Sequence, residues 1–141
     1  MWKYLLFGLM LIIVTDGKSQ IVKIEFKTFT RGFQKEAFFT ADSLIQITNK
    51  CGVMDVSKRK IDTLEWQKLQ TAIEQVQEQK IAALPSPSSR RAFDGAMHSS
   101  ITLINKDNAS YTHSFDDEYP HEDLLPLMEV ISSIIGENIE R

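Results

Sequence analysis

Apolar and polar side chains alternate along several stretches of the chain, with the period of two that is typical of a β-strand. In the first stretch, Val22, Ile24 and Phe26 occupy alternate positions and would share the buried face of a sheet. A later stretch, 53–61, carries three basic residues, 58–60, which would keep an exposed edge strand from pairing with other chains. The pattern predicts strands over residues 21–29, 38–48, 53–61, 98–103 and 110–115.

The last two strands form a predicted hairpin around Asp107 and Asn108, whose side chains favour turns because they bond the local backbone. A two-residue loop would place Thr102 opposite His113 and would separate the apolar residues of the two arms. A three-residue loop would place Leu103 opposite His113 and collect the apolar residues on one face, so we favour that register. The outer face would then carry His98, Ser100, Thr102, Thr112, Ser114 and Asp116.

Two further stretches have the periodicity of an α-helix. The first, residues 62–79, begins with Asp62 and Glu65 at the spacing of a capping box. Its apolar stripe consists of Trp66, Leu69, Ile73 and Val76. The second, residues 121–135, ends before Gly136, which suits a helix C-terminus. The element order βββαββα predicts an α+β fold, with an antiparallel sheet of about five strands and two helices packed on one face.

The N-terminus has the organisation of a signal peptide. Lys3 supplies a positive charge, residues 4–14 are an unbroken apolar run, and Gly17 and Ser19 place small residues where a signal peptidase cleaves. Cleavage after Ser19 would remove residues 1–19 and leave residues 20–141 as a single α+β domain with no stable membrane span. The apolar run is too short to span a bilayer easily, but an uncleaved anchor and a buried N-terminal helix remain open. We therefore expect an exported protein, periplasmic or extracellular.

Composition narrows the function classes only slightly. The chain has 141 residues, enough for one domain, and its net charge of −3 provides no basic surface for nucleic acid. Cys51 is the single cysteine, so the chain cannot form an internal disulfide. A small buried hydrophobic role fits Cys51 well, while catalysis with a distant histidine and intermolecular pairing are alternatives.

The residues that could carry chemistry gather in and around the hairpin. Arg90 and Arg91 precede it, and Asp116 and Asp117 follow it, so closing the hairpin brings guanidinium and carboxylate groups together. This pairing would be either a structural latch on the Pro- and Ser-rich loop before it or a recognition surface. The candidate binding residues are Arg90, Arg91, Asp94, His98, Asp116 and Asp117.

Catalytic and metal-binding signatures are weak by comparison. His98, Asp116 and His121 would be ordinary zinc ligands, but their spacing is not that of a zinc motif, so we expect no metal and no cofactor. We assign no catalytic residue, because a general acid and base need a pocket that shifts their pKa. The alternative is a small hydrolase that uses His98 or His113 with Asp116.

Several short runs resemble a group of uncharacterised small exported proteins of Bacteroidetes-type bacteria. The resemblance covers residues 64–135 and rests on Leu64-Glu65-Trp66, Leu69, residues 84–90, Asp94-Gly95-Ala96, Tyr111 and Phe115-Asp116. The chain departs from the group at residues 117–121, where Gly- and Pro-rich sequence would be expected. The resemblance implies export and an α+β fold, and it implies no activity. We therefore expect an exported binding domain whose partner is a protein, an envelope component or a small ligand; a structural accessory subunit is a third class.

Overall fold

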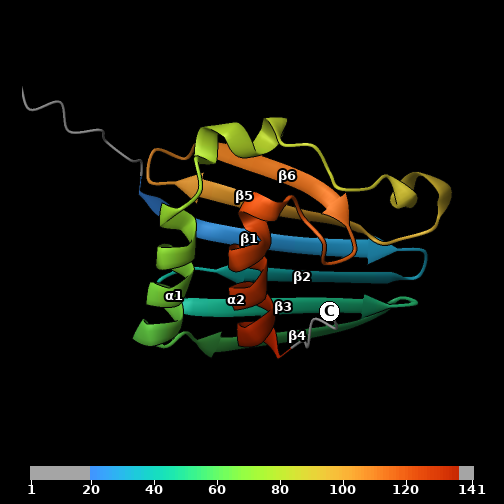
Figure 1. The fold of residues 1–141 in the computed structure, drawn as a ribbon. Coiled ribbons are helices and arrows are strands. Elements are labelled where there is room, and N and C mark those ends of the chain that lie inside the picture. Colours follow the sequence, from blue (N-terminus) through green and yellow to red (C-terminus); the bar gives the residue numbers. More distant parts are fainter. Residues whose placement is uncertain (1–19, 137–141) are drawn as a thin grey trace, which may run out of the picture.

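The computed structural model describes residues 20–136, and the predicted signal segment lies outside them. A single antiparallel sheet of six strands, in the order β4-β3-β2-β1-β5-β6, carries two α-helices on one face (Figure 1). The α+β class and the antiparallel sheet agree with the expectation from the sequence. The strands are β1 (Ile21–Thr30), β2 (Phe33–Phe39), β3 (Ser43–Lys50), β4 (Val53–Lys60), β5 (His98–Asn105) and β6 (Ser110–Asp116).

The helical elements connect β4 to β5 and follow β6. They are α1 (Thr63–Glu74), α2 (Leu125–Ile135) and three short 3₁₀ segments, η1 (Glu78–Ala83), η2 (Arg90–Phe93) and η3 (Glu122–Leu124). α1 starts at the predicted capping box, in which Glu65 accepts the backbone N–H of Asp62 at 3.0 Å. α2 ends at Gly136, which adopts a φ of 78°. The first helix is shorter than predicted, because the chain after Gln75 turns into η1 and runs beside β6.

The sheet has one strand more than the sequence predicted. Residues 38–48 were expected to form one strand, but the chain reverses after Phe39 and returns as β3. Thr40 closes this turn: its backbone N–H donates to the carbonyl of Ser43 at 3.0 Å, and its hydroxyl accepts the N–H of Ser43 at 3.1 Å. Polar side chains between Phe33 and Ala37 hide β2 in the sequence, although the strand is regular in the sheet.

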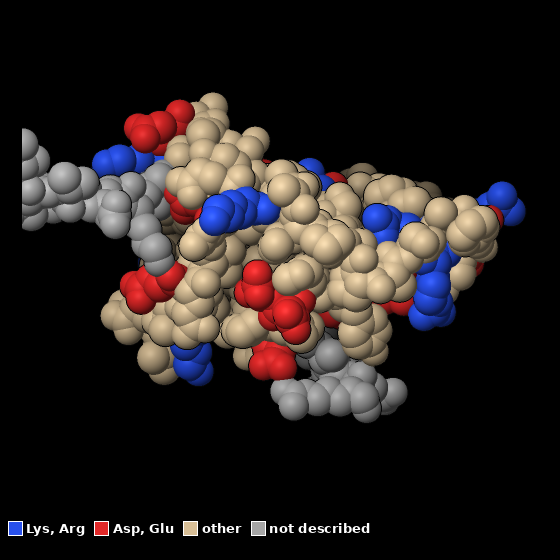
Figure 2. All heavy atoms as spheres, turned by 45° about the horizontal axis from the view of Figure 1, so that its top comes forward, with Lys and Arg blue, Asp and Glu red and all other residues tan. Residues whose placement is uncertain are grey.

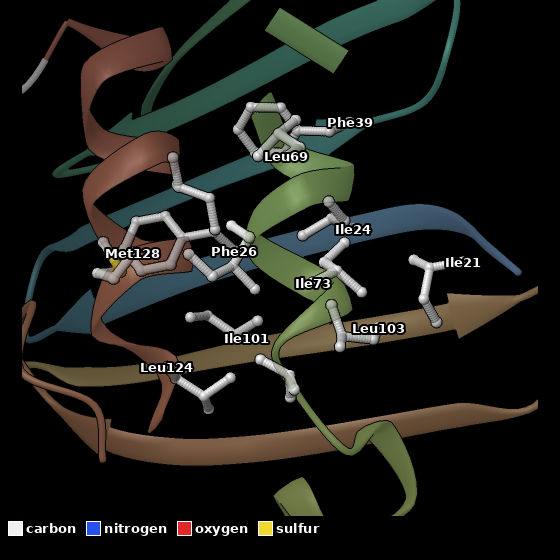
Figure 3. Packing of buried hydrophobic residues seen from close by; sticks show 14 of the residues in the cluster. Ile21, Ile24, Phe26, Phe39, Leu69, Ile73, Ile101, Leu103, Leu124 and Met128 are labelled. Atoms are coloured by element: carbon white, nitrogen blue, oxygen red, sulfur yellow. The ribbon is translucent and has the colours of Figure 1, made fainter. Parts of the chain in front are cut away.

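The hydrophobic core lies between the sheet and the two α-helices (Figure 3). Leu69 and Ile73 of α1 and Met128 of α2 face the strands, and all three are buried. The strands contribute fully buried side chains from alternate positions: Ile24, Phe26, Phe39, Leu44, Ile101, Leu103 and Phe115. The prediction for the start of β1 was wrong, since a register shift between Ile21 and Lys23 buries Ile21 and leaves Val22 exposed. The expectation that Cys51 is buried was also wrong, because Cys51 is exposed in the turn between β3 and β4.

The register of the β5–β6 hairpin differs from the favoured one by two residues. Ile101, rather than Leu103, lies opposite His113, and Leu103 lies opposite Tyr111. Because the shift is even, the apolar residues still share the inner face and the hydroxyls the outer face. The cause is the buried Asn105, whose side chain accepts the backbone N–H groups of Asp107 and Ala109 at 3.0 and 2.9 Å and holds a longer loop.

Candidate functional site

Asp116, the last residue of β6, organises the predicted Arg–Asp cluster. One of its carboxylate oxygens, Oδ2, accepts the hydroxyl of Ser88 and the backbone N–H of Arg90, the latter at 2.8 Å. The other, Oδ1, accepts the Nη1 of Arg91 at 2.6 Å and the backbone N–H of Arg91 at 3.4 Å. Asp116 is buried, with 3% of its surface exposed. We call this group, Ser88, Arg90, Arg91 and Asp116, the Asp116 hub.

The hub keeps Asp116 ionised. Burial alone would raise the pKa of this carboxyl, but the hydrogen bonds from Ser88, from the Arg91 side chain and from two backbone N–H groups outweigh burial and lower the pKa to about 2. Arg91 also donates to the hydroxyl of Ser86 and to the carbonyl of Ser88, each at 3.1 Å. The carboxylate and the Arg91 guanidinium therefore both hold residues 86–91 against the end of the sheet.

The remaining predicted site residues lie around the hub and contact it in different ways. The Arg90 side chain points out of the hub, and its Nη2 donates to the carbonyl of Gly95 at 2.6 Å. Asp94 is exposed and takes the left-handed conformation, with a φ of 55°. Asp117 accepts the backbone N–H of Met97 at 2.9 Å and so ties the start of β5 to the end of β6.

His98 lies opposite Asp116 in the β5–β6 register, and both residues were expected on the outer face. Its ring stacks on that of Phe29, with centroids 4.9 Å apart and an interplanar angle of 13°. Phe29 is exposed over 51% of its surface, so the pair forms an accessible aromatic spot on the sheet. Periodicity placed His98 on the outer face, but its contact with Phe29 joins β1 to β5, which only the strand order determines.

His113 is buried on the inner face, as expected, and serves as an acceptor. Its Nε2 accepts the backbone N–H of His121 at 3.1 Å, so this nitrogen carries no proton. Burial lowers the pKa of His113, and the nearby His121 and Arg91 lower it further, while backbone hydrogen bonds with Leu84 and Ile81 oppose the shift. His113 thus joins β6 to η1 and to the segment before η3.

The sheet face away from α1 and α2 forms a second candidate surface, which we call the open face. Its central positions hold an ionic ladder: Lys23 and Lys27 pair with Glu25 at 2.8 and 3.4 Å, and both ammonium groups lie over the Phe38 ring. Toward the β6 edge, Thr102 and Thr112 share a hydrogen bond of 2.8 Å. By strand register, the open face carries Phe29, Lys27, Glu25 and Lys23 of β1, Glu36 and Phe38 of β2, Ile45 and Ile47 of β3, Met54 and Val56 of β4, His98, Ser100 and Thr102 of β5, and Thr112 and Ser114 of β6.

The distribution of charge on the surface and the position of its hollows bear on the kind of site the protein could hold. In the view of Figure 2, acidic and basic side chains are interspersed among uncharged ones, without a broad field of one sign. The hollow between α1 and α2 is shallow and open, and it is lined by Leu64, Gln67, Lys68, Thr71, Ala72, Gln75, Pro126, Glu129, Val130 and Ser133. None of the hub residues and neither buried His113 nor His98 contributes to it.

Two absences hold for the part of the chain that the structure describes. Between residues 20 and 136, no group of three or more His, Cys, Asp or Glu side chains has an arrangement that could hold a metal ion. No helix within the same residues has the length and apolar character needed to cross a membrane.

Sequence comparison adds no relative. No protein-family model and no curated protein matches the chain.

Proposed function

We propose that this protein is a small exported binding domain without catalytic activity, which engages its partner through the open face of its sheet. Both α-helices cover one face of the six-stranded sheet (Figure 1). The observation that carries the proposal is the opposite face, on which the strand register places charged, hydroxyl and aromatic side chains. An antiparallel sheet can present such a face to water because its other face supplies the core. The partner is a protein, an envelope component or a small ligand.

The hydrogen bonds of the buried Asp116 and His113 argue for binding rather than hydrolysis. A general base needs a free acceptor near the substrate, and a histidine–carboxylate pair needs the two groups in hydrogen-bond contact. Both Asp116 oxygens already accept donors of the hub, and His113 Nε2 accepts a backbone N–H. His98 lies opposite Asp116 on the neighbouring strand, but its ring stacks on that of Phe29.

The candidate binding residues divide into two groups under this proposal. Arg91, Asp116 and Asp117 shape the end of the sheet through internal hydrogen bonds. Arg90, Asp94 and His98, together with Phe29, which periodicity alone did not single out, present accessible groups at the same end. We propose that the partner contacts this second group and the adjoining hydroxyl rows of the open face.

Capture from an envelope extract tests the proposal. The immobilised protein should retain a defined component, and Phe29→Asp should reduce its recovery at least tenfold while leaving the melting temperature within a few degrees, because Phe29 is exposed. Gln67→Asp, on the exposed side of α1, is the matched control and should retain full capture. Equal capture by both variants would refute a role for the open face.

A hydrolase would behave differently in the same preparation. Turnover of a generic ester or peptide substrate that disappears in a folded His98→Ala variant would contradict the proposal and favour the alternative, a small hydrolase.

Export is tested separately, by the intact mass of protein from its native compartment. Cleavage after Ser19 predicts a chain that starts at Gln20, and Met1 retained on cytoplasmic material would exclude export.

A further inference from the structure

Among the described residues, β4 forms an edge of the sheet that no other strand covers. All eight of its residues are exposed, and Val53, Met54 and Val56 are exposed over 74, 65 and 57% of their surfaces. Within residues 20–136, β3 is the one strand that pairs with β4. The opposite edge is different, because η1 packs along β6. A regular, partly apolar edge strand with free backbone groups is a template for pairing with another strand.

The turn between β3 and β4 determines which backbone groups face outward. Cys51 and Gly52 form a two-residue turn with φ values of 49° and 87°, so Lys50 and Val53, which flank it, form a hydrogen-bonded pair. Hydrogen-bonded and non-bonded pairs alternate along an antiparallel ladder. The backbone N–H and C=O groups of Met54, Val56 and Lys58 therefore point away from β3 and are directed at the free edge. The carbonyl of Lys60 instead accepts the Arg59 guanidinium at 3.0 Å.

The side chains of β4 make this edge complementary to itself. Its first half, Val53 to Val56, is apolar with one carboxylate, and its second half, Lys58 to Lys60, is basic. In an antiparallel pair the two halves meet, so the basic run of one strand faces the apolar and acidic half of the other. A parallel pair would instead place the two basic runs side by side, where like charges repel.

We propose that two copies of this chain associate through antiparallel β4 strands, with Val56 of one copy directly opposite Val56 of the other. In this register the outward backbone groups of Met54 meet those of Lys58 in the second copy. Asp55 lies opposite Ser57, diagonal to Arg59 of the second copy. Lys58 rests beside the Met54 side chain, and the two Lys58 residues are separated by four positions. Repulsion between the two basic runs therefore disfavours registers that bring them together, whereas this register keeps them apart.

Disulfide trapping tests the register. Paired residues in a hydrogen-bonded position have Cα atoms about 5.5 Å apart, which a disulfide can bridge. In a Cys51→Ser background, Val56→Cys should give a covalent dimer under mild oxidation. Met54→Cys, on the same strand and face and at least as exposed, should give at least tenfold less, because it faces Lys58. Equal trapping at both positions would overturn the register, as would stronger trapping at Ser57→Cys.

Sedimentation of the native chain tests the association itself. The weight-average mass of the wild type should rise toward that of a dimer with concentration, and Val56→Lys should abolish this rise by placing two ammonium groups face to face. Ser114→Lys, on the same sheet face but on β6, is the matched control and should sediment as the wild type. A wild type that stays monomeric at millimolar concentration would overturn the proposal without affecting partner capture through the open face.

Discussion

The Asp116 hub leads to a quantitative prediction, because a buried carboxylate with four donors cannot be neutralised without loss. Asp116→Asn preserves the size of the side chain but removes its charge, and it leaves the Arg91 guanidinium, 24% exposed, without an anionic partner. The pKa of Asp116 falls from an ordinary 3.8 to about 2. At 1.36 kcal/mol per pKa unit, ionisation of this one group stabilises the fold by about 2 kcal/mol.

We expect Asp116→Asn to reduce the free energy of unfolding at pH 7 by about 2 to 4 kcal/mol. The lower value follows from the pKa, and the upper value is typical of breaking a buried ion pair by removing one partner. A domain of this size has about 5–15 kcal/mol of stability, so the loss is a large share of the total. A latch at the protein surface, one of the two alternatives from the sequence, would contribute about 1 kcal/mol or less, and the burial of Asp116 raises that expectation.

The direction of the pKa shift determines how the stability contribution of Asp116 changes with pH. Because the folded-state pKa lies below the ordinary value, the contribution of Asp116 is fully present above pH 4 or so and is lost as pH falls from 3.8 toward about 2. The difference in stability between wild type and Asp116→Asn should therefore shrink by about 2 kcal/mol between pH 7 and pH 2.

Urea unfolding followed by Trp66 fluorescence measures both quantities. Asp107→Asn, on the exposed hairpin loop, is the matched control and should change stability by less than about 0.5 kcal/mol. An Asp116→Asn variant as stable as this control at pH 7 would refute the argument. A difference between wild type and Asp116→Asn that persists unchanged to pH 2 would refute the linkage.

Four further predictions concern the buried face of the sheet, the His113 hydrogen bond, the turn at Gly95 and the expected absence of a metal site. Ile101→Asp should unfold the domain by burying a carboxylate, whereas Ser100→Asp, on the open face, should shift the melting temperature by only a few degrees. Lowering the pH from 7 to 5 should reduce stability measured by urea unfolding, because protonation of His113, whose pKa is lowered, would break its acceptor bond; a flat profile would contradict this assignment. Gly95→Ala should lower the melting temperature more than Arg90→Ala, because an added Cβ would lie 3.1 Å from the Arg90 carbonyl oxygen. Treatment with a chelator should leave the melting temperature unchanged, and stoichiometric zinc in the purified protein would contradict the expected absence of a metal site.

The Gly95 prediction keeps its direction but changes its reason. The sequence indicated a turn at Asp94-Gly95 in which the glycine would adopt a positive φ. In the structure Asp94 takes the left-handed conformation, and Gly95 is needed because its backbone approaches Arg90 closely. A dipeptide signal identifies a turn, but the residue that carries the positive φ depends on the contacts around it.

Periodicity determined much of this protein by itself. Alternation placed Ile101, Leu103 and Phe115 on the buried face, and helical spacing placed Leu69 and Ile73 in the core. Those predictions hold because side-chain direction is a local property of the backbone, with a period near two in strands and 3.6 in helices. The same local rules identified the capping box of α1 and the glycine that ends α2. They failed at Val22, where a bulge changes the phase of the alternation.

Tertiary structure alone decided how far each element extends and which side chains meet. β2 carries too many polar residues to alternate clearly, and it is a strand because β1 and β3 satisfy its backbone on both sides. The hairpin register depends on the buried Asn105, and the contact between His98 and Phe29 depends on the strand order. Asp116 and Arg91 were close neighbours by topology, yet the hydrogen bonds that lower the carboxyl pKa come from the folded loop at residues 86–91. Local sequence sets the direction of each side chain, whereas partners and burial are set by segments distant in the chain.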